Sequence, residues 1–406
     1  IVEVDDTAFV GKNVISNDKV LKKLRGEKGS RVKLGVLRST SPEMLTYEVV
    51  RDDIPVNSVD VAFMVNAEIG YIKINKFGRT TYAEFLNGLA QLKNKNAKKY
   101  IIDLRSNSGG ILEVAINMIN EFLPKNQLIV YTEGKAFPRS EAVSNGSGAF
   151  KEEQMVVLID EWSASASEIF AGAIQDNDRG VIIGRRSFGK GLVQNQLSFA
   201  DGSAIRLTIA RYYTPSGRSI QKEYELGHGE EYEKDILNRF MHGEFDNPDS
   251  IKQNDSQIYT TRLGRTVYGG GGIMPDIFVP RDTIGVTTYL NDVINKGIIY
   301  QYAFKYSDEN RTLLSAFKDY KELQNYLGQQ PLIREFATFA AAQGVKRNSE
   351  EIRESQELLT NYIESYIARN ILGDNAFYPI LLQEDKTFLK AVEVLDQDGG
   401  FPTLGE

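Results

Sequence analysis

Two short stretches carry side chains that could perform nucleophilic chemistry. "SASASEIFAGAIQDN", residues 163–177, holds three serines that alternate with alanines ahead of a helix-like pattern, and "RRSFGKG", residues 185–191, places Lys190 between two glycines. A serine hydroxyl becomes a useful nucleophile only when a neighbouring base accepts its proton, and the usual base is histidine. The bases that the chain offers therefore decide which serine chemistry is open to it.

The two histidines of the chain, His228 and His242, lie in an irregular charged stretch, residues 222–262, so we expect solvated loop residues and no histidine-based triad. Lysine can replace histidine when a dry site or a nearby positive charge lowers its pKa from roughly 10.4. Lys190 directly follows the apolar strand pattern "GVIIGR" and lies beside Phe188, in a glycine-flanked loop that can direct its amine into a cleft. A lone lysine in a turn is ordinarily a solvated charge, and on these residues alone both interpretations stay open.

Composition excludes several other classes of function. A chain of 406 residues that is 41% hydrophobic can bury a full core and form two or three domains. Its 48 basic and 55 acidic residues give a net charge of −7, which argues against nucleic acid and anionic membranes as partners. The absence of cysteine excludes thiolate nucleophiles and zinc–thiolate sites. No apolar run is long enough to span a bilayer, and we expect any export signal to have been removed from this chain.

The pattern of apolar residues divides the chain into three expected domains. Residues 1–56 predict a small module of short strands around one helix. In residues 57–286 apolar strands such as "KKYIIDLR" and "QMVVLID" alternate with helices, which predicts a parallel sheet covered on its faces. Residues 222–262 interrupt this unit as an irregular surface insertion.

Residues 287–406 are expected to form a helical C-terminal domain. An apolar stripe at steps of three and four residues runs along one predicted helix and needs a partner surface. Its members are Leu359, Tyr362, Ile363, Tyr366, Ile367 and Ile371. Because such stripes exceed what one small bundle face would cover, we expect this domain to assemble subunits into a homo-oligomer.

Four motifs, in this order, closely resemble those of the carboxy-terminal processing (tail-specific) serine proteases: "YIIDLRSNSGG", "VVLIDEWSASASEIFAGAIQDNDRGVIIGRRSFGKGLVQ", "RYYTPSGRSIQ" and "GGIMPDI". The resemblance covers roughly residues 1–285. It implies an α/β peptidase core of the crotonase/ClpP-like fold and a serine endopeptidase that cleaves polypeptides with accessible C-termini near that end. It implies no metal and no other cofactor.

The resemblance also assigns roles to individual residues. Ser165, the middle serine of its motif, matches the nucleophile of the family, and Lys190, 25 residues later, matches the base. Gln194 matches a glutamine that assists the lysine. Glu168 and Asp176 match acidic positions that support the site.

Elementary chemistry supports this assignment at Ser165, which follows a predicted strand and precedes a predicted helix. Backbone N–H groups at a helix N-terminus favour negative charge, so an oxyanion would be stabilised there. Gly109 and Gly110 permit the backbone conformation that turns further N–H groups toward the same point. Such a glycine pair could equally mark an ordinary turn. Taken together with the resemblance, it predicts an oxyanion hole formed by Gly109, Gly110 and the N–H of Ala166.

Four neighbouring residues have plainer interpretations. With the helix expected to begin near Ser167, that serine is predicted to be its cap, and Ser163 a turn residue. Glu168 and Asp176 could equally be ordinary charges of the helix, and a direct role for them in proton transfer is not expected.

The N-terminal module resembles the later part of a PDZ domain, the family's substrate-recruiting unit, which binds a C-terminal carboxylate by strand addition. The first half of that domain, with its glycine-rich carboxylate loop, is expected to precede Ile1. The resemblance further implies the bacterial cell envelope, either periplasmic or extracellular.

Two alternatives remain open. The same fold hosts non-catalytic proteins that bind peptides or other ligands, because fold does not fix function. A crotonase-type enzyme acting on acyl-CoA would use the glycine-lined hole to stabilise an enolate. Intact Ser165 and Lys190 favour the peptidase over both.

Overall fold

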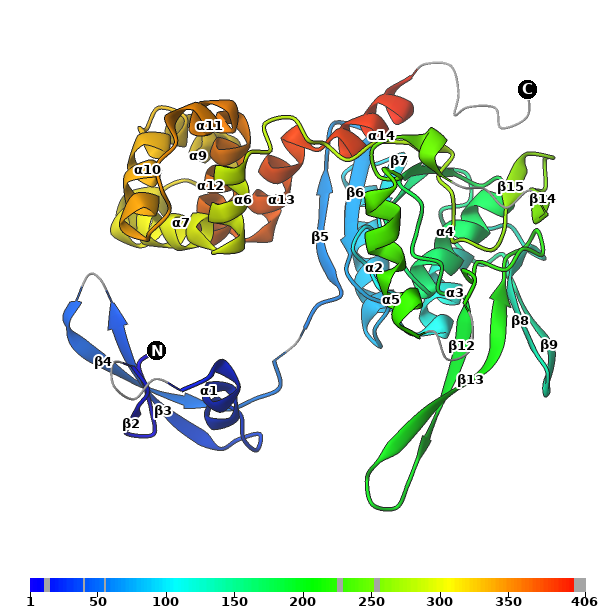
Figure 1. Ribbon diagram of the computed structural model, residues 1–406, viewed down its shortest axis with the longest axis horizontal. Coiled ribbons are helices and arrows are strands. Elements are labelled where there is room, and N and C mark those ends of the chain that lie inside the picture. The colour runs from blue at the N-terminus through cyan, green and yellow to red at the C-terminus, as the bar shows by residue number, and fades with distance from the viewer. Residues whose placement is uncertain (11–14, 39–40, 55, 225–228, 252–255, 398–406) are drawn as a thin grey trace.

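The computed structural model describes residues 1–10, 15–38, 41–54, 56–224, 229–251 and 256–397. Figure 1 shows three parts: a small β module at the N-terminus, a central α/β core, and a bundle of helices. The expected mixed α/β chain with a helical C-terminal region is thus confirmed. The comparison of the first part with a PDZ domain and the exact domain boundaries stay predictions.

The N-terminal module is a four-stranded antiparallel sheet in the order β2-β1-β3-β4, with one helix. Its elements are β1 (Glu3–Val4), β2 (Thr7–Ala8), α1 (Asn17–Leu24), β3 (Arg31–Arg38) and β4 (Ser41–Val50). Helix α1 contains no buried residue, so this module holds only a small core around Val4 and Val32. Figure 1 shows it standing apart from the α/β core.

A six-stranded sheet forms the centre of the core, in the order β16-β11-β10-β7-β6-β5. The strands are β5 (Val59–Met64), β6 (Ile69–Ile74), β7 (Lys99–Asp103), β10 (Gln154–Ile159), β11 (Val181–Gly184) and β16 (Ile277–Phe278). Neighbours are parallel except β5, which runs antiparallel to β6. Burial on both faces explains why β7 and β10 are nearly continuous in apolar residues.

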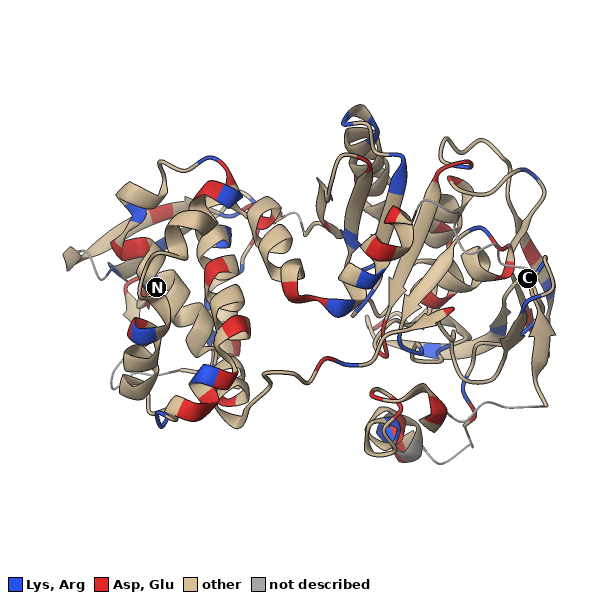
Figure 2. Ribbon diagram, turned by 90° about the horizontal axis from the view of Figure 1, so that it is seen from above, with Lys and Arg blue, Asp and Glu red and all other residues tan. Residues whose placement is uncertain are grey.

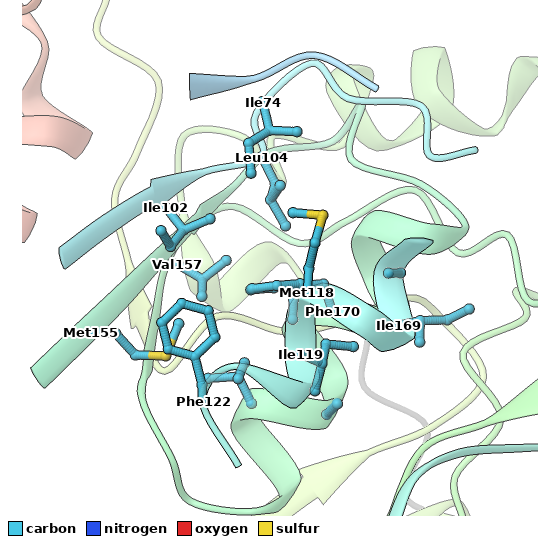
Figure 3. Close-up of a cluster of buried hydrophobic side chains, with 14 of the residues drawn as sticks. Ile74, Ile102, Leu104, Met118, Ile119, Phe122, Met155, Val157, Ile169 and Phe170 are labelled. Atoms are coloured by element: carbon cyan, nitrogen blue, oxygen red, sulfur yellow. The ribbon is translucent and has the colours of Figure 1, made fainter. Parts of the chain in front are cut away.

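Three helices cover one face of this sheet: α2 (Thr81–Asn94), α3 (Leu112–Asn120) and α4 (Ala166–Asp176). Figure 3 shows side chains of α3 and α4 meeting those of β7 and β10, among them Met118 and Val157. The rings of Phe122 and Phe170 lie 6.3 Å apart and nearly perpendicular, a favourable aromatic arrangement. Helix α4 is buried along its whole length, which fixes the position of its N-terminus.

The opposite face of the sheet is covered by α14 (Lys386–Asp396), which follows the bundle in the chain. Phe388 packs edge-on against Tyr71 at 5.5 Å, and Leu395 is fully buried beside the sheet. The region expected to form a separate helical domain therefore ends in a helix that packs on the core.

A second, antiparallel sheet has the order β12-β13-β8-β9. Its strands are β8 (Leu128–Gly134), β9 (Phe137–Val143), β12 (Leu192–Ser198) and β13 (Ala204–Tyr213). Strands β12 and β13 form a hairpin that extends away from the core in Figure 1. The base of β12 lies only two residues beyond Lys190.

The expectation of an irregular insertion at residues 222–262 is wrong in part. This stretch contains the helix α5 (Gly229–Met241), the 3₁₀ turn η2 (Pro248–Ser250) and β14 (Ile258–Thr260), which pairs with β15 (Thr266–Tyr268). The buried face of α5 includes Arg239, which is 4% exposed. A helix that packs through charged side chains lacks the apolar periodicity by which helices are recognised.

The bundle is held by its own hydrophobic core. Its helices are α6 (Thr288–Asn295), α7 (Ile298–Glu309), α8 (Arg311–Leu314), α9 (Tyr320–Leu327), α10 (Leu332–Ala342), α11 (Ser349–Glu354), α12 (Gln356–Leu372) and α13 (Asp374–Leu381). The turn η3 (Leu382–Glu384) leads from the bundle to α14. In the described part of the chain no helix is long and apolar enough to cross a membrane.

The apolar stripe of α12 is covered within the chain itself. Leu359, Ile363 and Ile367 are fully buried in the core of the bundle, and the tyrosines of the stripe pack against that core. The stripe therefore leaves no apolar surface that calls for a second subunit, and the homo-oligomer stays a prediction. Figure 2 shows acidic and basic residues interspersed over the core and the bundle.

We expect Phe388→Ala to lower the free energy of unfolding by about 3–5 kcal/mol, because it leaves a cavity against Tyr71 on the second face of the sheet. Denaturant titration measures the change. Leu389→Ala, at a neighbouring exposed position of α14, is the matched control and should change stability little. Equal stability of the two variants would contradict the role given to α14.

Candidate functional site

Ser165 lies at the N-cap of α4, directly after the loop that follows β10. Its φ of 55° and ψ of −113° fall in a region that residues other than glycine rarely adopt, so the backbone here is strained. Such strain persists only where surrounding contacts enforce it. The prediction that Ser167 caps the helix is wrong, because α4 begins at Ala166 and Ser167 Oγ instead donates a hydrogen bond to the carbonyl of Asn107 at 2.8 Å.

The structure brings the predicted nucleophile, base and assisting glutamine to one cleft of about 320 Å³. The cleft is lined by Ser108, Gly109, Gly110, Ser165, Lys190, Leu192, Gln194, Gln196, Arg206 and Tyr212. None of these lining residues is acidic, and two, Lys190 and Arg206, are of basic type. Gln194 reaches the cleft from β12, a strand that the sequence pattern did not reveal.

Glu168 connects the two loops that meet at the cleft. Its Oε2 accepts the backbone N–H of Ser165 at 2.9 Å and that of Lys190 at 2.8 Å. Its Oε1 accepts the N–H of Gly189 at 2.6 Å and the hydroxyl of Ser187 at 2.5 Å. One fully buried carboxylate thus binds the backbone of Ser165 and the backbone of residues 189 and 190 through its two oxygen atoms.

The surroundings of Glu168 suit an ionised carboxylate that holds position. Burial raises the pKa of Glu168 above its ordinary value, although the four donated hydrogen bonds oppose that rise. Three of the four donors are backbone N–H groups, which could not accept a hydrogen bond from the O–H of a neutral carboxyl group. With both oxygens occupied in this way, Glu168 has no free position toward the cleft.

Asp176 lies at the other end of α4 and does not line the cleft. It forms an ion pair with Arg218 at 2.7 Å, in which neither side chain is exposed, and accepts the hydroxyl of Ser216 at 2.7 Å. Arg218 also donates to Gln175 at 2.7 Å. Asp176 therefore anchors the turn of the "TPSGRS" segment to α4, and it is no surface charge.

Two glycines form the wall of the cleft opposite Ser165. Gly109 has φ of 97°, and a Cβ atom there would lie 2.5 Å from the carbonyl oxygen of Ala164. Gly110 has φ of 149°, and a side chain there would collide with the carbonyl of Phe77. Only glycine permits this close approach of two backbone segments.

The N–H groups near Ser165 are not equivalent. That of Gly109 donates to Asn107 Oδ1 at 2.9 Å. Those of Gly110 and Ala166 have no acceptor among the described residues. The available donors beside the nucleophile are therefore Gly110 and Ala166, and Gly109 serves as a close-packing residue.

Asn107 is a buried site residue that the sequence analysis missed. Its Nδ2 donates to the carbonyl of Ile74 at 2.9 Å, and its own carbonyl accepts the N–H of Ala164 at 3.0 Å. Together with the bonds to Gly109 and Ser167, these contacts join residues 104–111, which we call the glycine loop, to the loop after β10 that leads to Ser165. The available signal was one amide side chain between two serines at a strand end, in "RSNSGG".

A network of ion pairs lies at the end of β7, where the glycine loop begins. Asp103, at the end of β7, accepts the Tyr71 hydroxyl at 2.7 Å and pairs with Lys73 at 3.3 Å and Arg105 at 2.6 Å. Arg105 also pairs with Asp385, the N-cap of α14, at 2.6 Å. Burial alone would raise the pKa of Asp103, but the charges of Arg105 and Lys73 outweigh it and hold the pKa well below its usual range.

His242 lies outside the cleft: it is exposed at the end of α5, with Nδ1 2.6 Å from the carbonyl of Asn238. His228 lies outside the described residues. Among the residues that the structure describes, no three His, Asp or Glu side chains are grouped to hold a metal ion.

Comparison with known families gives two matches. Residues 68–229 match the model of Peptidase family S41, a range that includes Ser165, Lys190 and the glycine loop. Residues 289–373, within the bundle, match a family of unknown function, DUF8443.

Curated relatives match the same central part. A "Carboxyl-terminal-processing protease" of Synechocystis is 34% identical over 216 residues, which cover 52% of this chain and 50% of the relative. One from Picosynechococcus is 38% identical over 204 residues, covering 49% and 48%. A "Carboxy-terminal-processing protease" of Bartonella bacilliformis is 36% identical over 239 residues, covering 54% of each. The chain spans about half the length of the curated relatives it matches.

Among solved structures, a photosystem II D1 C-terminal processing protease aligns with 69% of this chain and 62% of its own length. The sequence identity is 24% and the TM-score is 0.40.

We expect Asp103→Asn to flatten the dependence of stability on acid pH. Because the pKa of Asp103 is lower in the folded than in the unfolded chain, its stabilising contribution is present above roughly pH 4 and is lost as the pH falls through the folded value. Unfolding free energies from about pH 7 to 2 should therefore fall less steeply in the variant. At pH 7 the variant should be less stable by about 3–5 kcal/mol, because Arg105 and Lys73 lose their counter-charge.

Asp292→Asn, at an exposed position of α6, is the control and should retain the acid profile of the parent chain. Parallel profiles for Asp103→Asn and the parent would show that this carboxyl group does not titrate as described.

Proposed function

We propose that the chain is a serine endopeptidase that cleaves polypeptides near their C-terminus through Ser165 and Lys190, and the match of residues 68–229 to the model of Peptidase family S41 supports this. One observation carries the proposal: Glu168 Oε2 accepts the backbone N–H groups of both residues, which keeps nucleophile and base in one cleft. The names of the relatives, all bacterial processing proteases, support the same reaction class.

The reaction is acyl transfer in two halves. Unprotonated Lys190 accepts the proton of the Ser165 hydroxyl as Oγ bonds to the carbonyl carbon of the scissile peptide. The C–N bond then breaks, and the proton passes from Lys190 to the leaving amine. A water molecule, deprotonated in turn by Lys190, hydrolyses the acyl-enzyme and restores the serine. Gln194, on β12 beside Lys190, assists the lysine.

The negative charge of the tetrahedral intermediate lies on the former carbonyl oxygen. We assign the N–H groups of Gly110 and Ala166 as its donors, because both lack an acceptor among the described residues, Gly110 lines the cleft with Ser165, and Ala166 directly follows Ser165 in the chain. The N-terminus of α4 adds a favourable dipole at the same point. One such donor contributes on the order of 10²–10³ in kcat in serine peptidases.

The substrate proposed is an extended polypeptide with an accessible C-terminus. Strand β12 is the edge strand of its sheet and contributes Leu192, Gln194 and Gln196 to the cleft, so an extended chain can add beside it. The PDZ-like module of residues 1–56 is proposed to recruit the C-terminal carboxylate. We place the protein in the bacterial envelope, periplasmic or extracellular, and a homo-oligomer remains part of the proposal.

Ser165→Ala and Lys190→Ala should each lower cleavage of an unstructured polypeptide by at least about 10³-fold, because one removes the nucleophile and the other its base. Time courses followed by mass spectrometry give both the rate and the position of the cut. Ser140→Ala, at an exposed position of β9, should cleave at the parent rate. A parent chain that binds the polypeptide without cutting it would favour the non-catalytic alternative, and a variant as active as the parent would remove the dyad.

Glu168→Gln should lower kcat by at least about 10²-fold, because its amide NH₂ would face N–H donors and release the two loops. Steady-state kinetics and a melting curve, recorded together, separate loss of alignment from loss of fold. Glu113→Gln, on the exposed side of α3, is the matched control. Full activity in a folded Glu168→Gln variant would refute the alignment role.

A further inference from the structure

Helix α5 packs against the loop that carries Lys190. We call residues 186–190 the base loop. Arg239 of α5 donates from Nη1 to the carbonyl of Ser187 at 2.9 Å and from Nη2 to that of Arg186 at 2.7 Å. Its guanidinium is therefore a two-pronged donor to consecutive carbonyls, a geometry that a planar fork provides and a lysine does not.

A second contact from α5 reaches the other end of the base loop. Lys222 donates its backbone N–H to the carbonyl of Gly189 at 2.9 Å, and its ammonium pairs with Asp235 of α5 at 2.9 Å. The ammonium lies 4.0 Å from the ring centre of Phe188 and 4.1 Å from that of Tyr232. Lys222, at 7% exposure, thus links α5 to the base loop through charge and aromatic contacts.

Glu244 completes this arrangement beyond the end of α5. Its Oε2 accepts Arg239 Nε at 3.1 Å and Arg186 Nη2 at 2.5 Å. Arg239 thus donates from Nε to Glu244 and from Nη1 and Nη2 to the two loop carbonyls, and these three contacts fix the orientation of its guanidinium group.

The base loop is thus held from two directions, through its N–H groups by Glu168 and through its carbonyls by Arg239. Glu168, inside the core, accepts the N–H groups of Gly189 and Lys190. Arg239, from α5, holds the carbonyls of residues 186 and 187. Both the N–H groups and the carbonyls of the base loop therefore have fixed partners, which restricts the backbone that carries the Lys190 side chain.

We propose that α5 is a positioning element for the general base, with Arg239 and Asp235 as its positioning residues. The inference rests on the proposed peptidase function. Most of α5 lies beyond the segment matched to the peptidase family, which ends at residue 229. A displacement of about 1 Å at a reacting group can lower the rate by a factor on the order of 10². Loss of the contacts between Arg239 and the base loop, which we call the clamp, should therefore slow the chemical step.

The test compares Arg239→Ala, Arg239→Lys and Asp235→Asn with the control Lys234→Ala, which alters an exposed charge of the same helix. For Arg239→Ala we expect kcat to fall about 10- to 100-fold with KM changed less than about twofold. Arg239→Lys should recover only part of kcat, since lysine lacks the fork. Asp235→Asn, at a partly exposed position, should show a smaller fall in kcat of the same kind.

Hydrogen exchange provides a readout that does not need activity. The amide protons of Gly189 and Lys190 should exchange faster in Arg239→Ala than in the parent, while those of β10 keep the parent rate. Faster exchange in a chain that cuts no polypeptide would retain the clamp and remove the peptidase function. Parent-like exchange and kcat in folded Arg239→Ala and Asp235→Asn would overturn the inference, as would an equal effect of Lys234→Ala.

Discussion

The site depends on one buried carboxylate. Glu168 is fully enclosed, and its two oxygens accept donors from the nucleophile loop and from the base loop at once. A charge in such surroundings costs free energy unless donors surround it, so the two loops cannot separate without exposing or neutralising it. Ser165, whose backbone is strained, donates its N–H to this carboxylate. The position of the Ser165 hydroxyl therefore depends on Glu168 staying buried and in place.

The sheet explains how loops distant in sequence reach this carboxylate. β7, β10 and β11 are parallel neighbours, so their C-terminal ends lie along one edge. The glycine loop follows β7, Ser165 follows β10 and Lys190 follows β11, and functional loops gather at this edge in open α/β sheets. Asn107 joins the first two loops and Glu168 the last two.

Much of this arrangement could be predicted from local pattern. Apolar strands, the helix after Ser165 and the glycines around Lys190 each leave a signature within a few residues, and the order of the motifs supplied the roles. The contacts of Asn107, the occupied N–H of Gly109 and the clamp by Arg239 could not be predicted, because each depends on which distant backbone group lies within reach. The sequence pattern did not reveal helix α5, because its buried side chain among the described residues is that of the charged Arg239, and the coverage of the α12 stripe followed only from the tertiary arrangement of the bundle.

The course of the chain between its two coverings of the sheet has a consequence for biosynthesis. Helices α2 to α4 cover one face early, but α14 covers the other only after all the helices of the bundle have been made. During translation the sheet therefore emerges with one apolar face uncovered, and Arg105 can pair with Asp385 only after the helices of the bundle have been synthesised.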